Sequence, residues 1–311
     1  MEPPVSPAYL SERGGANLLG RTLLFGATSI TGHAMMRQSL GHIVAVASRA
    51  AVARRARWNA ADAEDAASVA ALLAQERPEV VIWAHAVCDV AKCEANPEWA
   101  QAINVRGIEN LLAHLPAATR LVYVSSDHVF GGDGIYTEGC EPVPISVYGR
   151  TRVAAERRVL ERPGSLVVRP GLAIGPSADG RSGFLDWLSY RHARGLPVTV
   201  VSDEYRSVVW ADDLAARLLS LAASDVVGLR HIPAERAVSR PELAHYLLRL
   251  RGINPRFDER TRFEQSAPHL GKVEIRSIYG DTYARSLAPV VPARASQEVG
   301  LNHNSKLKTQ N

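Results

Sequence analysis

Short hydrophobic runs alternate with amphipathic segments along the first half of the chain. Five runs are mainly apolar with no polar alternation, at residues 21–25, 43–47, 80–84, 121–125 and 166–169. Strands of this kind are buried on both faces of a sheet. Between them, helical spacing of apolar residues predicts helices near 32–40, 63–76, 97–112 and 148–160. Alternating strands and helices predict an α/β fold, a doubly wound parallel sheet.

The pattern changes at both ends of the chain and after residue 170. Residues 1–20 show no periodicity and predict a flexible extension, while 21–170 predict the α/β domain. Residues 171–290 predict mainly a smaller second domain, with helices near 183–194, 211–223 and 240–251. Residues 291–311 predict a polar tail, which is expected to fray.

The composition excludes several classes of protein. The chain has 311 residues, of which 46% are hydrophobic and 22% are charged, as in ordinary globular domains. The mean hydropathy is −0.08, and no run of about twenty apolar residues exists, so no transmembrane helix is expected. The proline-rich start lacks the apolar stretch of a secretory signal. We therefore expect a cytoplasmic protein without a membrane partner.

Charge and cysteine content narrow the possible partners. The net charge is only +4, from 36 basic and 32 acidic residues. The densest basic cluster is too short for a nucleic-acid footprint but suits a phosphate; it comprises Arg49, Arg54, Arg55 and Arg57. The three cysteines lack the two-residue gap of a zinc or redox motif, which predicts reduced thiols and no metal site; they are Cys88, Cys93 and Cys140.

A glycine-containing loop separates the first predicted strand from the first helix. A glycine after the strand permits a tight turn, and a second glycine lets the helix pack closely on the sheet. The helix N-terminus then faces a pyrophosphate with unpaired N–H groups. Glycine also ends strands for structural reasons alone, but the order strand, turn, helix favours dinucleotide binding. The binding residues are predicted to be Gly26, Thr28, Ser29, Ile30 and Gly32.

The end of the second strand bears on which dinucleotide binds. NAD-binding proteins usually carry an acidic residue there for the ribose diol. This chain has Ser48 and Arg49 instead. A hydroxyl and a guanidinium suit a 2′-phosphate, so we expect NADP(H) rather than NAD(H). A solvated basic loop is the alternative.

Two hydroxyl groups and a cation are predicted at the ligand edge of the sheet. Ser126 follows the strand at 121–125, and ligands of α/β proteins bind at the carboxyl ends of strands. Tyr148 and Arg152 open the helix at 148–160, where residues four apart share a face. A phenol beside a fixed cation can have its pKa lowered and can transfer a proton.

These motifs, taken in order, resemble the extended short-chain dehydrogenase/reductase superfamily, and within it the dTDP-4-dehydrorhamnose reductase group. The resemblance spans about residues 21–215. Its motifs are the glycine loop, Asp62, Ala84-His85-Ala86, Asn104-Val105, Ser125-Ser126-Asp127-His128-Val129-Phe130, Val147-Tyr148-Gly149-Arg150-Thr151-Arg152, Arg169-Pro170-Gly171 and Asp212-Asp213-Leu214-Ala215.

The resemblance implies a catalytic role for several residues. Tyr148 would protonate a carbonyl oxygen as hydride arrives, and Ser126 would hold that oxygen. Asp127 matches the acidic residue of the reductase group. His128 replaces the group's usual tyrosine and is expected to pack beside the substrate rather than act as an acid or base. Arg206 is expected either to hold an anionic substrate group or to form a surface ion pair.

The resemblance also implies cofactor contacts. Gly26 and Gly32 would meet the pyrophosphate, and Asp62 the adenine, although Asp62 has an alternative role as a helix N-cap. The ribose side would be lined by Ala84, His85 and Ala86. Asn104 would support the site structurally.

Three departures from the family pattern affect the expected activity. Ser29 replaces the middle glycine of the loop, and Trp83 and His85 stand where small residues or asparagine are usual. Arg152 replaces the lysine that normally contacts the nicotinamide ribose and keeps the tyrosine acidic. Arginine keeps the charge but is larger and planar.

Several functions stay open at this point. The first is an NADP(H)-dependent reductase that acts on a ketone of a sugar nucleotide or a related polar metabolite. The second is a catalytically silent NADP(H)-binding partner protein, for which the methionine adenosyltransferase β subunit is a precedent. An epimerase or dehydratase with retained cofactor, and a scaffold without cofactor, are further alternatives. A homodimer is also open, because the family often dimerises through helices beside the sheet.

Overall fold

The computed structural model describes residues 20–39, 43–49, 58–180, 182–279 and 290–292. Most of the expected extension and tail, together with Arg54, Arg55 and Arg57, lies outside the described residues. One sheet has seven parallel strands in the order β11-β7-β5-β4-β1-β2-β3. This order is typical of the Rossmann fold, so the predicted fold class is confirmed. Its strands are β1 (Thr22–Phe25), β2 (Ile43–Ala47), β3 (Asn59–Ala60), β4 (Val80–Trp83), β5 (Arg120–Val124), β7 (Leu166–Pro170) and β11 (Gly228–Ile232).

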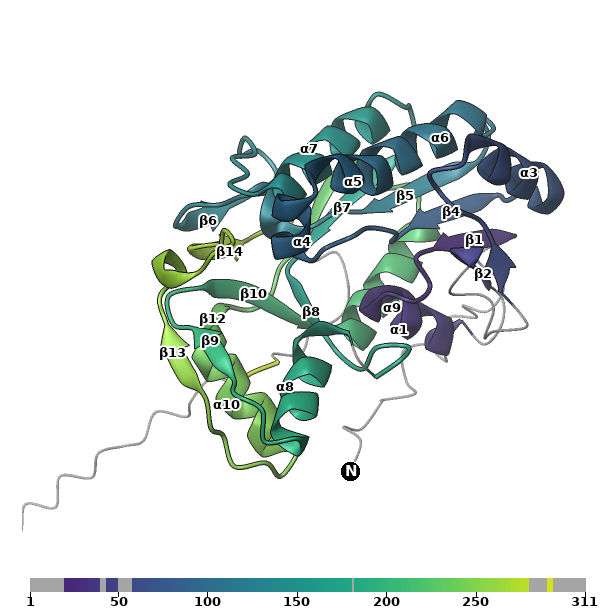
Figure 1. The fold of residues 1–311 in the computed structure, drawn as a ribbon. Helices are drawn as coiled ribbons and strands as arrows, with labels where there is room; N and C mark the ends of the chain where they lie inside the picture. The colour runs from purple at the N-terminus through teal and green to yellow at the C-terminus, as the bar shows by residue number, and fades with distance from the viewer. Residues whose placement is uncertain (1–19, 40–42, 50–57, 181, 280–289, 293–311) are drawn as a thin grey trace, which may run out of the picture.

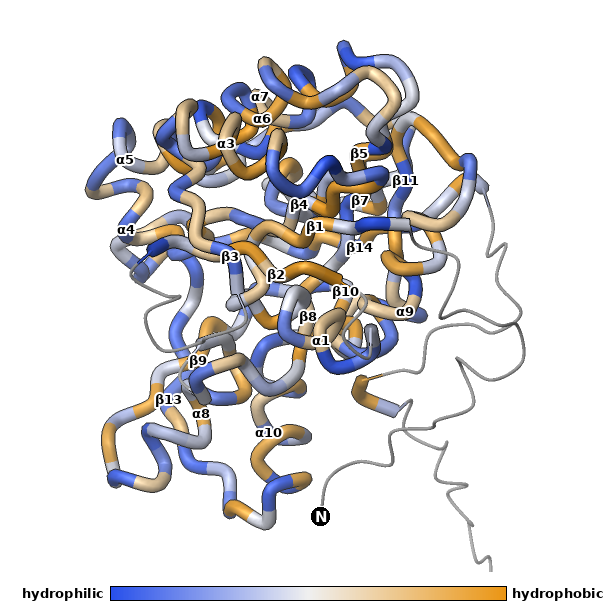
Figure 2. Tube along the Cα trace, turned by 90° about the vertical axis from the view of Figure 1, so that its right-hand side faces the viewer, coloured by the Kyte–Doolittle hydropathy of each residue, from blue (hydrophilic) through white to orange (hydrophobic). Residues whose placement is uncertain are grey.

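Helices cover both faces of this sheet, which explains why its strands are apolar throughout (Figure 1). One face packs against α3 (Ala66–Glu76), α6 (Gly107–His114) and α7 (Val147–Leu160). The other packs against α1 (Ile30–Gln38) and α9 (Ala211–Ala222). Neighbouring residues of β1 point to opposite faces of the sheet. Leu23 packs on the side of α3, α6 and α7, and Leu24 packs on the side of α1 and α9. Figure 2 shows the hydrophobic strands in the interior of the molecule.

The helix predicted for 97–112 contains a local widening. It consists of α5 (Pro97–Gln101), a π-helical turn at Ala102–Arg106, and α6, and the shorter helix α4 (Val90–Ala95) precedes it. A π-turn inserts one extra residue per turn and is frequent at functional sites. Here it places Asn104, which is fully buried, against the segment that follows β4.

Much of the chain after β7 forms a smaller lobe, to which β6 contributes a strand from before β7. Its main sheet is ordered β12-β10-β14-β6, with β8 paired to β10, and β13 pairs with β9. The strands are β6 (Gly134–Tyr136), β8 (Leu172–Ile174), β9 (Thr199–Val201), β10 (Tyr205–Trp210), β12 (Ala237–Ser239), β13 (Asp258–Arg260) and β14 (Lys272–Ile275). The core of this lobe lies between α8 (Gly183–Ala193), α10 (Arg240–Leu250) and the strands.

The chain does not stay in the smaller lobe after residue 170. Helix α9 returns to pack on α1, and β11 adds the last strand beside β7. Three predicted helices, near 183–194, 211–223 and 240–251, correspond to α8, α9 and α10. Within the described ranges, no helix is both long and apolar enough to span a bilayer.

Candidate active site

The carboxyl ends of β1, β4 and β5 bring the predicted site residues to one edge of the sheet. The glycine loop follows β1, the segment of residues 84–89 follows β4, and Ser126 follows β5. All three strands are parallel neighbours, so these segments lie side by side. Helix α7 adds Tyr148 and Arg152 from its first two turns.

The two glycines of the loop are needed for close backbone packing. Gly26 has φ +82°, and a Cβ there would lie 2.5 Å from the carbonyl carbon of Ala84. A Cβ on Gly32 would lie 2.2 Å from the carbonyl oxygen of Gly26. The close backbone packing of this turn therefore requires glycine at both positions.

Ser29 takes a capping role at the position of the missing glycine. It has φ −65°, a conformation that needs no glycine, and it is the N-cap of α1. Its Oγ accepts a hydrogen bond from the Gly32 backbone N–H at 2.9 Å. The first-turn N–H groups of Ile30 and Thr31 have no intrahelical acceptor and are the donors that a pyrophosphate would use.

Arg49 lies at the end of β2 and is held by two carboxylates. Its side chain is 64% exposed, and its Nε lies 3.5 Å from Asp62 Oδ2. Its Nη2 lies 3.8 Å from Asp65 Oδ2. Asp62 also accepts the backbone N–H of Arg49 at 3.1 Å. The alternative of Asp62 as a helix cap is wrong, because Asp65 caps α3 through the N–H groups of Ala67 and Ser68.

Ser126, Tyr148 and Arg152 meet at the end of β5. Tyr148 is 6% exposed and Arg152 is 2% exposed. Burial raises the pKa of Tyr148 above its usual 10.0, and the positive charge of Arg152 and a hydrogen bond with Ser126 act in the opposite direction. The phenol is therefore protonated at neutral pH and has a hydroxyl and a cation beside it.

Two of the three nitrogens of the Arg152 guanidinium do not donate a hydrogen bond to any described residue. Its Nη2 donates to the carbonyl oxygen of Val124, and its Cζ lies 4.7 Å from the centre of the Tyr123 ring. Its Nε and Nη1 are buried and have no hydrogen-bond partner among the described residues, and the same is true of His85 Nε2. Unpaired buried donors cost about 1–3 kcal/mol each. A group rich in acceptor oxygens, such as the ribose and carboxamide of a nicotinamide nucleotide, fits these donors.

Asn104 braces the segment that follows β4. Its Oδ1 accepts the Val87 N–H at 2.8 Å, and its Nδ2 donates to the Val87 carbonyl at 3.0 Å. The same Nδ2 donates to Thr151 Oγ1 at 2.9 Å, which ties the segment to α7. Ala84, His85 and Ala86, all partly buried, precede this brace at the predicted cofactor side.

Arg206 does not lie where an anionic substrate group could use it freely. It is 2% exposed and forms buried ion pairs, so the alternative of an ion pair at the surface is wrong. Its Nε donates to Asp127 Oδ2 at 2.7 Å and its Nη2 to Asp127 Oδ1. Its Nη1 donates to Glu204 Oε1 at 3.2 Å. Two carboxylates already balance this charge, so Arg206 holds Asp127 in place.

No sequence pattern singled out the other members of this network. Glu204 is 1% exposed and also contacts Arg240 at 3.0 Å and His269 at 2.8 Å. Burial opposes ionisation, but Arg240, His269 and Arg206 together bring the pKa of Glu204 well below its usual 4.5. A carboxylate in the sequence Asp203-Glu204-Tyr205-Arg206 looks like a surface residue, and only the pairing of β10 with its neighbours buries it.

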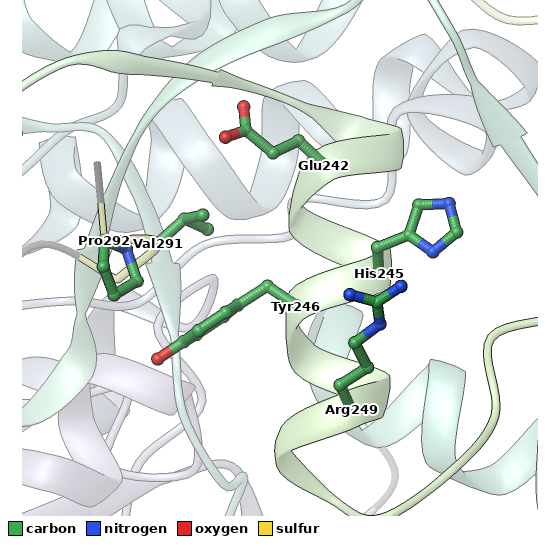
Figure 3. A pocket seen from close by; sticks show the side chains of 6 residues that line it. All are labelled: Glu242, His245, Tyr246, Arg249, Val291 and Pro292. Atoms are coloured by element: carbon green, nitrogen blue, oxygen red, sulfur yellow. The ribbon is translucent and has the colours of Figure 1, made fainter. Parts of the chain in front are cut away.

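A groove of about 560 Å³ runs along α10 (Figure 3). It contains no predicted site residue and is lined by Glu242, His245, Tyr246, Arg249, Val291 and Pro292. Among the residues that the structure describes, no three His, Cys, Asp or Glu side chains gather as a metal site.

The chain matches the profile of one known protein family. The family profile described as the RmlD substrate binding domain matches residues 20–269. The chain belongs to this family. The match covers the whole large sheet and most of the smaller lobe, so the extended short-chain dehydrogenase/reductase resemblance is confirmed.

The relatives of this RmlD family chain include proteins named as reductases and one named as a subunit of another enzyme. The probable low-salt glycan biosynthesis reductase of Haloferax volcanii is 32% identical over 57% of this chain and 61% of the relative. The dTDP-4-dehydrorhamnose reductase of Streptomyces griseus is 32% identical over 62% and 66%. Methionine adenosyltransferase 2 subunit beta of Xenopus tropicalis is 35% identical over 50% and 47%. The matches thus span less than two thirds of each relative.

Solved structures share the fold. A dTDP-4-dehydrorhamnose reductase of Clostridium acetobutylicum has a TM-score of 0.72 and 25% identity, over 84% of this chain and 91% of that one. That of Bacillus anthracis, in complex with NADP, has a TM-score of 0.68 and 21% identity, over 82% and 89%. The dTDP-glucose 4,6-dehydratase of Streptomyces venezuelae, with NAD bound, has a TM-score of 0.70 and 21% identity, over 83% and 88%.

Proposed function

We propose that the chain is an NADP(H)-dependent reductase of a ketone carried on a sugar nucleotide. The meeting of Ser126, Tyr148 and Arg152 at the end of β5 carries the proposal. Membership of the RmlD family and relatives named as dTDP-sugar reductases support the substrate class.

The chain's own residues would handle the carbonyl oxygen and its proton. A bound NADP(H) would supply the hydride. Tyr148 donates the proton, because burial keeps its phenol protonated. Ser126 holds the oxygen. At present Ser126 Oγ donates to Asp127 Oδ1 at 3.2 Å and accepts from the His128 N–H at 3.2 Å. The hydroxyl must therefore turn from Asp127 to the substrate oxygen.

Arg152 would do the work of the family lysine by another geometry. Burial raises the pKa of Tyr148, and the charge of Arg152 lowers it, which makes the phenol a stronger acid than it would be without Arg152. Its unpaired Nε and Nη1 would bind the nicotinamide ribose. The contact of Nη2 with the Val124 carbonyl fixes the guanidinium plane.

Arg49 supports a preference for NADP(H) over NAD(H). It is exposed at the end of β2, where residues of this fold contact the 2′-substituent of the adenine ribose. A 2′-phosphate would have to replace its contacts with Asp62 and Asp65, which are 3.5 and 3.8 Å long and therefore weak.

The proposal is tested by following NADPH oxidation with dTDP-4-dehydrorhamnose as the substrate. We expect turnover by the wild type and a loss of about 10²–10⁴-fold in Tyr148→Phe, since general acid catalysis contributes that much. Tyr279→Phe, which changes an exposed tyrosine, is the matched control. An epimerase or dehydratase would convert a substrate without net consumption of NADPH. Equal rates for Tyr148→Phe and wild type would refute the proposal.

A catalytically silent, cofactor-binding partner protein is the second candidate. Arg152 in place of lysine favours it, as does the 35% identity to a relative named as a subunit. This function predicts that NADPH raises the melting temperature while no carbonyl is reduced. Absence of a shift with either dinucleotide would count against both candidates.

A further inference from the structure

His128 lies between the two residues expected to handle the carbonyl. It belongs to the 3-10 turn Asp127–Val129, two positions after Ser126. Its ring centre lies 5.1 Å from that of Tyr148, with the planes at 69°. A Cβ on Gly149 would lie 2.3 Å from the His128 carbonyl oxygen, so the first turn of α7 packs directly on this backbone. The imidazole is thus fixed beside the phenol.

Arg206 determines which ring nitrogen of His128 is an acceptor. Arg206 Nη1 lies 3.2 Å from His128 Nε2. A guanidinium has N–H donors and no acceptor. Nη1 carries two hydrogens, and its two partners are Glu204 Oε1 and His128 Nε2. His128 Nε2 must therefore offer its lone pair.

The remaining proton of His128 is consequently on Nδ1. Burial and the neighbouring charge of Arg206 lower the pKa of His128 to about 3, although Asp127 and Glu204 act in the opposite direction. The ring is neutral at pH 7 and carries one proton. With Nε2 as the acceptor, that proton is on Nδ1.

The Nδ1–H group has no partner in the described part of the chain. It is buried, and no side chain or backbone acceptor meets it. Leaving a buried donor unpaired is unfavourable, so such groups are met by water or by a ligand. The His128 backbone N–H donates to Ser126 Oγ, and the imidazole ring packs against the Tyr148 ring, so His128 lies beside the carbonyl site.

We propose that His128 Nδ1–H donates a hydrogen bond to an oxygen of the sugar-nucleotide substrate, next to the carbonyl that Tyr148 protonates. The inference rests on the proposed function. It makes His128 a specificity-determining residue, which selects keto sugars that carry a hydroxyl or ring oxygen near the ketone. A site built to bond such an oxygen rejects analogues that lack it.

Two amide variants separate this role from support of Arg206. An asparagine amide nitrogen takes the place of histidine Nδ1, whereas the amide group of glutamine reaches the place of Nε2. We expect kcat/KM for dTDP-4-dehydrorhamnose to be about ten-fold lower in His128→Gln than in His128→Asn, as for the loss of one buried hydrogen bond. A residue that serves only Arg206 would give the reverse order. Equal or reversed values would overturn the proposal.

Nitrogen NMR of wild-type protein labelled with ¹⁵N-histidine gives a readout that needs no activity. We expect the Nδ1–H tautomer of His128 in the free protein, and a shift of this signal on adding dTDP-rhamnose with NADP⁺. An Nε2–H tautomer, or an Nδ1–H signal unmoved by that ligand, would overturn the inference. If the wild type fails to reduce dTDP-4-dehydrorhamnose, the proposed function fails for that substrate, and the tautomer and its response still decide the inference.

Discussion

Arg152 lies one helical turn after Tyr148 on α7, with its guanidinium carbon 6.0 Å from the centre of the Tyr148 ring. Both side chains are buried, so little water screens the charge from the phenol. The pair is therefore the electrostatic centre of the proposed site. It keeps a fixed positive charge where the family has a lysine, although the larger group is held by the Val124 carbonyl.

Replacing Arg152 should move the alkaline limit of ketone reduction. The reaction needs protonated Tyr148, so activity falls as pH rises through the pKa of the phenol. Arg152 lowers that pKa, hence Arg152→Gln raises it and shifts the alkaline limb of kcat/KM to higher pH. Arg152→Lys keeps the charge and should leave the limb near its wild-type position. A pH–rate profile in which both variants shift equally would show that the charge is not responsible.

Glu204 should stabilise the protein only above acidic pH. Glu204→Gln removes one partner of a buried ion pair, and we expect about 3–5 kcal/mol less free energy of unfolding at pH 7. The folded-state pKa of Glu204 lies well below the ordinary 4.5. The stabilisation is therefore complete above pH 4.5 and is lost as pH falls through the folded-state pKa.

Urea unfolding at several pH values measures this effect. Glu109→Gln is the control, because the Arg158–Glu109 pair is 54% and 40% exposed and contributes about 0.2–1 kcal/mol. A difference between wild type and Glu204→Gln that stays constant from pH 7 down to pH 3 would contradict the expected linkage.

Gly26 should be far less tolerant of alanine than another glycine with a similar backbone. Gly164 has φ +76° and open space, so Gly164→Ala costs only left-handed strain of about 1–2 kcal/mol. Gly26→Ala adds a clash with the Ala84 backbone and should cost more, with loss of the NADPH-induced rise in melting temperature. Equal unfolding free energies for the two variants would mean that the backbone around Gly26 shifts at little cost to make room for a Cβ.

The large sheet and its ligand edge were predictable, because buried parallel strands and a strand–glycine–helix turn leave local signals. The supporting role of Asn104 was predictable, but the π-turn that places its side chain against the segment after β4 was not. The Arg206 contacts were not predictable, since Asp127 and His128 lie 79 and 78 positions away along the chain. Such pairs depend on how the smaller lobe docks, which no local pattern encodes. A homodimer and a cytoplasmic location stay predictions.

Arg49 should decide between the two dinucleotides. We expect Arg49→Ala to weaken NADPH binding about ten-fold, through loss of one charge-assisted contact, and to leave NADH binding nearly unchanged. Thermal unfolding with each cofactor measures both, because a ligand at a hundred times its Kd adds about 2.7 kcal/mol. Equal losses for NADPH and NADH would place the 2′-phosphate elsewhere.

Transfer of deuterium from labelled NADPH to a sugar nucleotide tests the central claim most directly. The protein is incubated with NADPH deuterated at the reactive carbon and dTDP-4-dehydrorhamnose, and the product is analysed by mass spectrometry. The proposed function predicts one deuterium in the reduced sugar with the wild type and hardly any product with Tyr148→Phe. A wild type that binds NADPH, as shown by its melting temperature, yet transfers no deuterium to this ketone would contradict the claim and favour the silent partner protein.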